Sequence, residues 1–220
     1  MVAPPVPDAA AFDRWDLRTR LHERPLDILT LQPGRPVELA GDPGYGLTRL
    51  GFRMLAEFSR GAPVVVVDVR GWMSPSAAWE SGVHRSHLVV VRCEDASVWP
   101  RVVAAIFEGV GAVFAEVPAG MRDRDLRRLT ALARSRGVRT ALRPVRGDLP
   151  PGVAHLRLRG VGVRWSGADR GHGRLGSRRL VLEASGKGAA GIVRRIEVED
   201  SGADAVHVVP GVAARGRAAG

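Results

Sequence analysis

The stretch Gly41-Asp-Pro-Gly-Tyr-Gly-Leu-Thr48 has the spacing of a phosphate-binding loop, G-x-x-x-x-G-K-[ST], which connects a strand to a helix. Gly41, Gly46 and Thr48 stand at the matching positions. The preceding residues 37–40 form a strand candidate, and apolar residues recur at helical spacing after the loop. A glycine-rich turn that caps a helix would show the same local pattern, so the flanking elements are what favour a phosphate loop.

The lysine of this motif is missing. In a working loop the backbone N–H groups wrap the phosphates, the lysine neutralises the β- and γ-phosphates, and the hydroxyl binds magnesium. Leu47 occupies the lysine position and cannot neutralise a phosphate, so turnover should suffer most. The sequence therefore predicts a degenerate phosphate loop made of Gly41, Gly44, Gly46, Leu47 and Thr48.

Strand and helix candidates alternate after the loop. Apolar strand candidates cover residues 63–68, 88–91, 112–117 and 138–142, and the longer helix candidates cover 98–110 and 123–136. This alternation implies right-handed βαβ crossovers and a parallel sheet. The last strand candidates, at 153–163, 178–183 and 191–198, have no helix between them. We therefore predict an α/β fold with a mostly parallel sheet flanked by helices and antiparallel C-terminal strands.

Two carboxylates close apolar strand candidates. Asp68 ends one of them, and Glu116 lies near the end of another. Because ligands bind at the carboxyl ends of parallel strands, we expect Thr48, Asp68 and Glu116 to gather at a descended nucleotide site. Glu116 fits the place of a magnesium-binding acid, although a polar residue at a strand end is also an ordinary feature of any parallel sheet.

Length and composition place the chain among globular proteins. Its 220 residues are 45% hydrophobic and 25% charged, as in a single domain of ordinary composition. The sequence contains no run of eighteen apolar residues and no secretion signal, and Cys93 is its only cysteine, which rules out an internal disulfide. We expect a cytoplasmic protein without membrane association.

Positive charge is concentrated in the second half of the chain. Residues 1–121 hold 12 basic and 14 acidic side chains, whereas residues 122–220 hold 21 basic and 9 acidic. This asymmetry suits a polyanion or an acidic partner, and it suits a solvated arginine-rich face equally well. The residues expected to contact DNA are Arg122, Arg124, Arg127, Arg128, Arg134, Arg136, Arg157, Arg159, Arg178 and Arg179.

The remaining candidates are weaker. Residues 1–36 are predicted to be an extension with a short helix, 37–200 the core and 201–220 a flexible tail, in which Val206, Val208 and Val209 would dock on a partner. His84 and His87 have metal-ligand spacing but no third ligand, so no metal site is expected. The tryptophans Trp72, Trp79 and Trp99 are expected to pack in the core or a cleft rather than to stack on bases.

Residues 37–53, 62–94 and 111–140 resemble the RecA-like core, and within it the ImuA/SulA branch found beside mutagenic polymerase genes. The actinobacterial ImuA-prime group is the most similar, and the resemblance covers residues 37–200. Three chemical positions of that core are lost. Leu47 replaces the lysine, Arg70 stands where the family places a catalytic glutamate, and Arg143 falls near the sensor glutamine. The two segments that match DNA-binding loops, 118–123 and 144–152, are short, so strand exchange is not expected.

The resemblance implies a non-catalytic pseudo-ATPase that serves as an accessory factor in DNA-damage-induced (SOS) translesion mutagenesis. Its partners would be a polymerase-like adaptor of the ImuB type, an error-prone polymerase and DNA, which would place it at the nucleoid when it acts. No cofactor is expected beyond weak residual nucleotide binding. Two alternatives stay open: an active ATPase, as an oligomer whose lysine comes in trans from Lys187, and a cell-division inhibitor similar to SulA.

Overall fold

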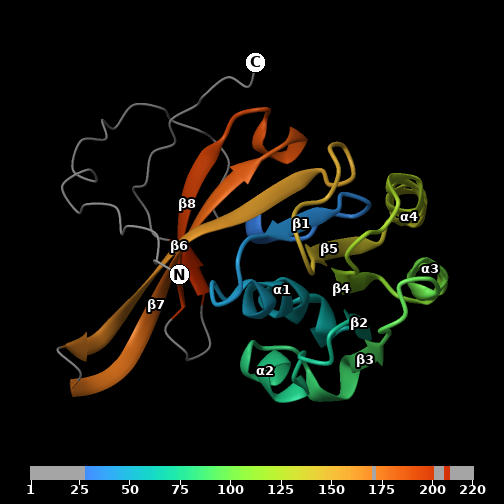
Figure 1. Cartoon of the computed structure of the whole chain (residues 1–220). Helices are drawn as coiled ribbons and strands as arrows, with labels where there is room; N and C mark the ends of the chain where they lie inside the picture. The colour runs from blue at the N-terminus through green and yellow to red at the C-terminus, as the bar shows by residue number, and fades with distance from the viewer. Residues whose placement is uncertain (1–27, 170–171, 201–205, 209–220) are drawn as a thin grey trace.

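A single nine-stranded sheet organises the computed structural model, which describes residues 28–169, 172–200 and 206–208 (Figure 1). The strand order is β3-β2-β4-β5-β1-β6-β7-β8-β9. The strands are β1 (Val37–Ala40), β2 (Val64–Asp68), β3 (Leu88–Arg92), β4 (Ala112–Val117), β5 (Arg139–Pro144), β6 (Leu156–Asp169), β7 (His172–Ser185), β8 (Arg194–Asp200) and β9 (Val206–Val208). Strands from β3 to β6 in this order pair in parallel, and those from β6 to β9 pair antiparallel. The predicted mixed α/β sheet is confirmed.

Helices cover both faces of the parallel part. The first two, α1 (Leu47–Ala56) and α2 (Pro75–Glu80), pack on one face, and α3 (Trp99–Gly109) and α4 (Asp123–Arg136) pack on the other (Figure 1). Short 3-10 turns lie at η3 (Phe58–Arg60), η4 (Arg85–His87) and η5 (Lys187–Ala189). The valines of β2 show why both faces need covering: Val64 and Val66 join the α1 core, while Val65 and Val67 join the α3–α4 core.

The helix candidates were well placed because their ends carry clear signals. The structure ends α4 at Gly137, whose φ of 66° is the left-handed conformation of a helix C-cap. Leu126 and Leu129, spaced to lie on one helix face, are buried, and Leu132 is partly buried. None of the helices in the described part of the chain is long and apolar enough to span a membrane.

Two strand predictions differ from the structure. The apolar run at 88–91 is typical of a buried strand, but the segment Leu88–Arg92 is the edge strand β3, and Val89 is 46% exposed because no further strand pairs beyond it. The C-terminal strands β6 and β7 are longer than predicted and form a long antiparallel hairpin that projects past the sheet (Figure 1). Glycines and arginines interrupt their apolar alternation, which hides their length in the sequence.

Two predictions, one for each end of the chain, concern residues that lie wholly or partly outside the described part. The expected N-terminal helix falls within residues 1–27, outside the described part. In the predicted tail, residues 206–208 form β9, which pairs with β8 through Asp200↔Val206 and Val198↔Val208. Val209 lies outside the described residues.

Candidate functional site

The glycine-rich stretch 41–48 connects the end of β1 to the start of α1, as the motif requires. Gly41, Gly44 and Gly46 all have positive φ, at 136°, 94° and 76°. Gly46 is the N-cap of α1 and offers no side-chain cap, so the first N–H groups of this helix have no side-chain acceptor. Because β1 is flanked by β5 and β6, the loop lies at the carboxyl edge of the parallel sheet.

Leu47, at the lysine position, points into the core. Its exposed fraction is 0%, and it belongs to the apolar cluster shared by α1 and β1. A Cβ placed on Gly41 would lie 3.2 Å from Leu47 Cδ1, so the loop closes tightly over this side chain. A lysine at position 47 in this conformation would have its ammonium group in an apolar environment and away from any phosphate.

Both strand-end carboxylates are used in hydrogen bonds to the protein. Asp68 accepts from the backbone N–H groups of Trp72 at 3.2 Å and Met73 at 3.1 Å, which closes the turn after β2. Glu116 accepts from the backbone N–H of Val69 at 3.0 Å, and also from the backbone and guanidinium of Arg70. Both carboxylates are fully buried, so each is committed to holding the loop after β2.

Four arginines surround the degenerate loop. Arg143 Nη1 donates a hydrogen bond to Thr48 Oγ1, the oxygen that would bind magnesium in a working loop. The guanidinium of Arg178 fills the space that a Cβ on Gly46 would need. Asp200 Oδ2 lies 2.8 Å from Arg178 Nη2 and 2.7 Å from Arg49 Nε, so this carboxylate bridges the two arginines. The fourth arginine is Arg70. Its guanidinium pairs with Glu116 and also stacks over the Trp72 ring, 4.5 Å from the ring centroid.

A cavity of about 470 Å³ opens beside the loop. Its charged lining residues are Arg49, Arg70, Arg143 and Glu116, and its other lining residues are Pro43, Gly44, Gly46, Thr48, Phe52, Trp72, Met73, Ser74 and Ala77. The predicted gathering of Thr48 and Glu116 is therefore observed, whereas Asp68 does not line the cavity.

Arg143 is the most unusual cation of this cavity. Its residue exposure is only 8%, and no carboxylate of the described chain lies within ion-pair distance of it. Burial lowers the pKa of Arg143, the charge of Arg70 lowers it further, and Glu116 opposes both effects. An arginine stays charged in proteins, so a buried, largely uncompensated positive charge faces the cavity.

Lys187, the lysine of the ATPase alternative, lies near the amino ends of the parallel strands, whereas the degenerate loop lies at their carboxyl ends. It belongs to the η5 turn, where the backbone N–H of Gly188 donates to His155 O at 2.9 Å. The backbone N–H of His155 in turn donates to Pro36 O at 2.8 Å, just before β1 begins. The phosphate loop follows the other end of β1, so Lys187 cannot reach the loop of its own chain.

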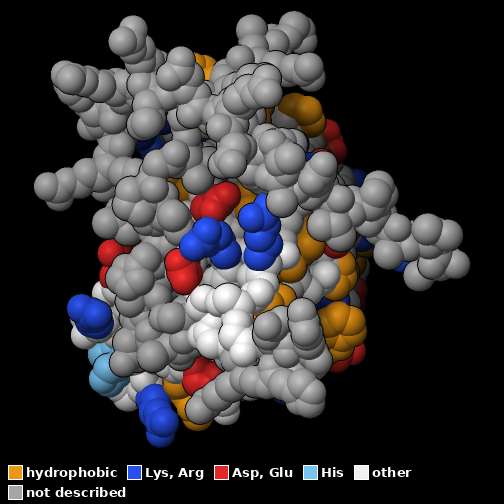
Figure 2. Space-filling model, turned by 90° about the vertical axis from the view of Figure 1, so that its left-hand side faces the viewer, with side chains coloured by type: hydrophobic (Ala, Val, Ile, Leu, Met, Phe, Trp, Pro, Cys, Tyr) orange, Lys and Arg blue, Asp and Glu red, His pale blue; other side chains and the backbone are white. Residues whose placement is uncertain are grey.

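The arginines predicted to contact DNA divide into two groups. Those on the C-terminal strands are engaged in ion pairs: Arg157 with Glu38, Arg159 with Asp148, Arg178 with Asp200, and Arg179 with Glu197 and Glu199. On α4 and at its N-cap Arg122, the pairs are longer or more exposed: Arg122 with Asp125, Arg127 with Asp123, and Arg136 with Glu108. No carboxylate of the described residues pairs with Arg124, Arg128 or Arg134. On the face in Figure 2, the central basic side chains lie beside acidic ones.

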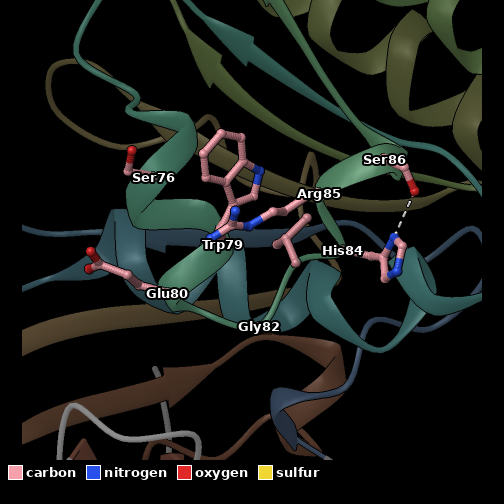
Figure 3. A pocket seen from close by; sticks show the side chains of 8 residues that line it. Ser76, Trp79, Glu80, Gly82, His84, Arg85 and Ser86 are labelled. Carbon is pink, nitrogen blue, oxygen red and sulfur yellow. Dashed lines mark hydrogen bonds between the residues drawn. The ribbon is translucent and has the colours of Figure 1, made fainter.

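A second, open cavity of about 840 Å³ lies between α2 and η4 (Figure 3). The Arg85 guanidinium stacks 5.0 Å from the centroid of the Trp79 ring, and Ser86 Oγ lies 2.9 Å from His84 Nδ1. His87 Nδ1 lies 2.6 Å from the Ser59 carbonyl oxygen. The ring Nδ1 atoms of both histidines are thus used locally, and no group of three metal-ligating side chains occurs among the described residues.

The tryptophans occupy three different environments. Trp99 is fully buried against α4, Trp79 is partly buried in the second cavity, and Trp72 is 71% exposed. Packing in the core or a cleft therefore describes Trp99 and Trp79, whereas Trp72 lines the cavity beside the loop with most of its surface exposed. Sequence reasoning missed the roles of Arg49 and Asp200 at the loop because neither belongs to a motif. Only Gly46, whose missing side chain leaves space for the Arg178 guanidinium, could have indicated a close contact at the loop.

Comparison with known families gives one finding. The model of the MT3502 N-terminal domain family matches residues 14–142, more than half of the chain. The match spans the degenerate loop, both strand-end acids and α4. A search of curated proteins finds no match. The chain belongs to the MT3502 N-terminal domain family.

Proposed function

We propose that this member of the MT3502 N-terminal domain family is a non-catalytic, RecA-like accessory factor of DNA-damage-induced translesion mutagenesis. In this role it binds a polymerase-like adaptor, of the ImuB type, and acts with an error-prone polymerase. The RecA-like assignment rests on the resemblance described above, together with a strand–glycine-loop–helix unit at the carboxyl edge of a mostly parallel sheet.

One observation carries the non-catalytic part of the proposal: the positions that would perform ATP hydrolysis are used to hold the fold together. Leu47 is a core residue, Glu116 clamps Arg70, and Arg143 donates to Thr48. Magnesium would find its hydroxyl ligand occupied and two guanidinium groups nearby. An in-line attack on a γ-phosphate needs a metal and a lysine at these same places.

The structure also offers a surface for the proposed DNA contact. The solvent face of α4 carries Arg124, Arg128 and Arg134, none of them paired with a described carboxylate. Arginines on one helix face can follow a phosphate backbone without reading its sequence. The strand arginines contribute less to this surface because their charge is compensated by neighbouring acids.

The test combines biochemistry and genetics. The purified protein and its Leu47→Lys variant should both show no magnesium-dependent ATP hydrolysis above a buffer blank. In cells, deletion of the gene should lower the mutation frequency after ultraviolet damage, and the Leu47→Ile variant should restore it. An unchanged mutation frequency in the deletion strain would refute the mutagenesis role.

The two alternatives give different results in the same experiments. Hydrolysis by the wild-type protein that Lys187→Ala abolishes would establish an oligomeric ATPase with its lysine in trans. Filamentation of cells on overexpression, with no change in mutation frequency, would establish a cell-division inhibitor similar to SulA.

A further inference from the structure

We propose that Arg35, Arg134, His155 and Lys187 form a binding site for a small dianionic oxyanion at the amino ends of the parallel strands. The degenerate loop lies at the carboxyl ends of the same strands, so this site is separate from the cavity beside Thr48. The oxyanion is either a free ion or the phosphoryl group of a small phosphomonoester, because both present the same dianion to these side chains. The proposed function does not depend on this site.

The four side chains come from four separate segments, and backbone hydrogen bonds hold three of these segments together. The backbone N–H of His155 donates to Pro36 O at 2.8 Å, directly after Arg35. The backbone N–H of Gly188, the residue after Lys187, donates to His155 O at 2.9 Å. The turn before β1, the start of β6 and the η5 turn therefore meet at His155.

Two glycines allow the closest approaches between these segments. A Cβ on Gly34 would lie 2.9 Å from Arg134 Cα, so the turn before β1 packs against the last turn of α4. A Cβ on Gly188 would lie 3.0 Å from His155 Cδ2, so the η5 turn packs against the imidazole ring. Side chains at these two positions would force the segments apart, so the glycines keep the four basic residues close together.

The cluster gathers positive charge without a compensating acid. Arg35, Arg134 and Lys187 are exposed, and in the described part of the chain none of the three forms an ion pair. Burial lowers the pKa of His155, and the charges of Arg35, Lys187 and Arg134 lower it further. No carboxylate of the described segments is among the charges that act on this imidazole.

Arginines elsewhere on the sheet have acidic partners. Arg157 pairs with the buried Glu38, and Arg178 pairs with Asp200. Like charges around His155 repel one another, and water weakens this repulsion without removing it. A dianion between them would offset the repulsion and would accept hydrogen bonds from the guanidinium, ammonium and imidazole N–H groups.

The experiment follows the ring proton on Cε1 of His155 by NMR in the full-length protein, between about pH 5 and 8. The signal is identified as the one of six histidine signals that His155→Asn lacks. Sulfate is the probe because it stays a dianion throughout this range, and chloride at equal ionic strength is the control. We expect saturable sulfate binding with one site per chain. The pKa of His155 should be higher in sulfate than in chloride, because a bound dianion favours the charged imidazole.

Two further probes distinguish the sources of the oxyanion. Inorganic phosphate and glycerol phosphate are titrated by calorimetry at one pH where both are dianions. Tighter binding of glycerol phosphate would assign the site to a phosphomonoester. Equal or tighter binding of inorganic phosphate would assign it to the free ion.

Variants locate the site. Arg35→Gln and Lys187→Gln should each weaken sulfate binding by at least about fivefold, because each removes a charged donor. Arg146→Gln, which changes an exposed arginine after the carboxyl end of β5, should leave binding unchanged. Arg134 is kept intact because it also belongs to the α4 face proposed to contact DNA. All three changes are at exposed positions, and circular dichroism establishes the fold of each variant.

Three results would overturn the proposal: no saturable sulfate binding by the wild-type protein, the same His155 pKa in sulfate and chloride, or full affinity in a folded double variant of Arg35→Gln and Lys187→Gln. None of these results depends on DNA binding, ATP hydrolysis or mutagenesis in cells. Failure here and failure of the proposed function are therefore separate outcomes.

Discussion

Arg70 and Glu116 form a two-point ion pair that joins the ends of two neighbouring parallel strands. Glu116 Oε1 accepts from Arg70 Nε at 2.9 Å and from Nη2 of the same guanidinium, while Oε2 accepts from the backbone N–H of Arg70 at 3.2 Å. Glu116 has an exposed fraction of 0%. The residue that best fits a magnesium-binding acid in the sequence is therefore a structural clamp on the loop after β2.

This clamp gives a first prediction about stability. Glu116→Ala should lower the free energy of unfolding by about 3–5 kcal/mol, because it leaves a partly buried guanidinium and two backbone N–H groups without their acceptor. Urea denaturation measures this loss. Glu108→Ala is the matched control. Its carboxylate is exposed and lies as far as 4.0 Å from the Arg136 guanidinium, so its loss should lower the free energy of unfolding by no more than about 0.5 kcal/mol. Equal costs for both variants would contradict the clamp.

The glycines of the loop allow a second prediction by comparison. Gly44 and Gly46 both have positive φ, so alanine at either should cost about 1–2 kcal/mol in backbone strain. Only at Gly46 would the new methyl overlap the Arg178 guanidinium, which Asp200 holds in place. Gly46→Ala should therefore cost about 1 kcal/mol more than Gly44→Ala.

A double-mutant cycle isolates that contact. The extra cost of Gly46→Ala should disappear when Arg178 is replaced by alanine as well. If the excess persists in the Arg178→Ala background, the guanidinium does not restrict position 46.

The fold was predictable where local signals agree. Valine runs such as residues 63–68 read as strands in any context, and α4 ends at a glycine that adopts a left-handed conformation. The long hairpin of β6 and β7 was not recognised in full because it gains its stability from pairing across the sheet, which a short apolar window does not record. The edge position of β3 also depends on strand order and not on its own residues.

The candidate site was predictable only in part. The spacing of glycines identified the loop, and the absence of lysine at Leu47 indicated lost chemistry. That Leu47 faces the core, that Glu116 is bonded to Arg70, and that Arg178 covers Gly46 all depend on residues distant in the sequence. Contacts of this kind arise from tertiary packing, and the sequence signals at most that a glycine such as Gly46 leaves room for a neighbour, not which residue fills it.

A third prediction concerns DNA. If the α4 face binds phosphates, the triple replacement of Arg124, Arg128 and Arg134 by glutamine should weaken binding to a fluorescent single strand. The salt slope should fall by about 0.7 for each arginine that neutralises a phosphate of the single strand in the wild-type complex. The matched control replaces three arginines that are ion-paired in the structure, Arg157, Arg159 and Arg179, by glutamine and should change the slope less. A larger effect from the strand arginines would move the DNA-binding surface away from α4.

The fourth prediction concerns pH. Burial lowers the pKa of His155, and the charges of Arg35, Lys187 and Arg134 lower it further. The imidazole is therefore neutral in the folded protein at pH values where the unfolded chain, with a pKa near 6.5, already binds a proton. Stability is full above pH 6.5 and is lost as the pH falls toward the lowered folded pKa, since the unfolded state then binds more protons.

Urea midpoints measured between about pH 5 and 7.5 check this dependence, because an unperturbed histidine titrates in that range. The midpoint of the wild-type protein should fall with decreasing pH more steeply than that of His155→Asn. Lys187→Gln should lie between the two, because it removes one of the three cations that repel a protonated His155. Parallel profiles for the wild type and His155→Asn would show that this histidine does not control the acid sensitivity of the fold.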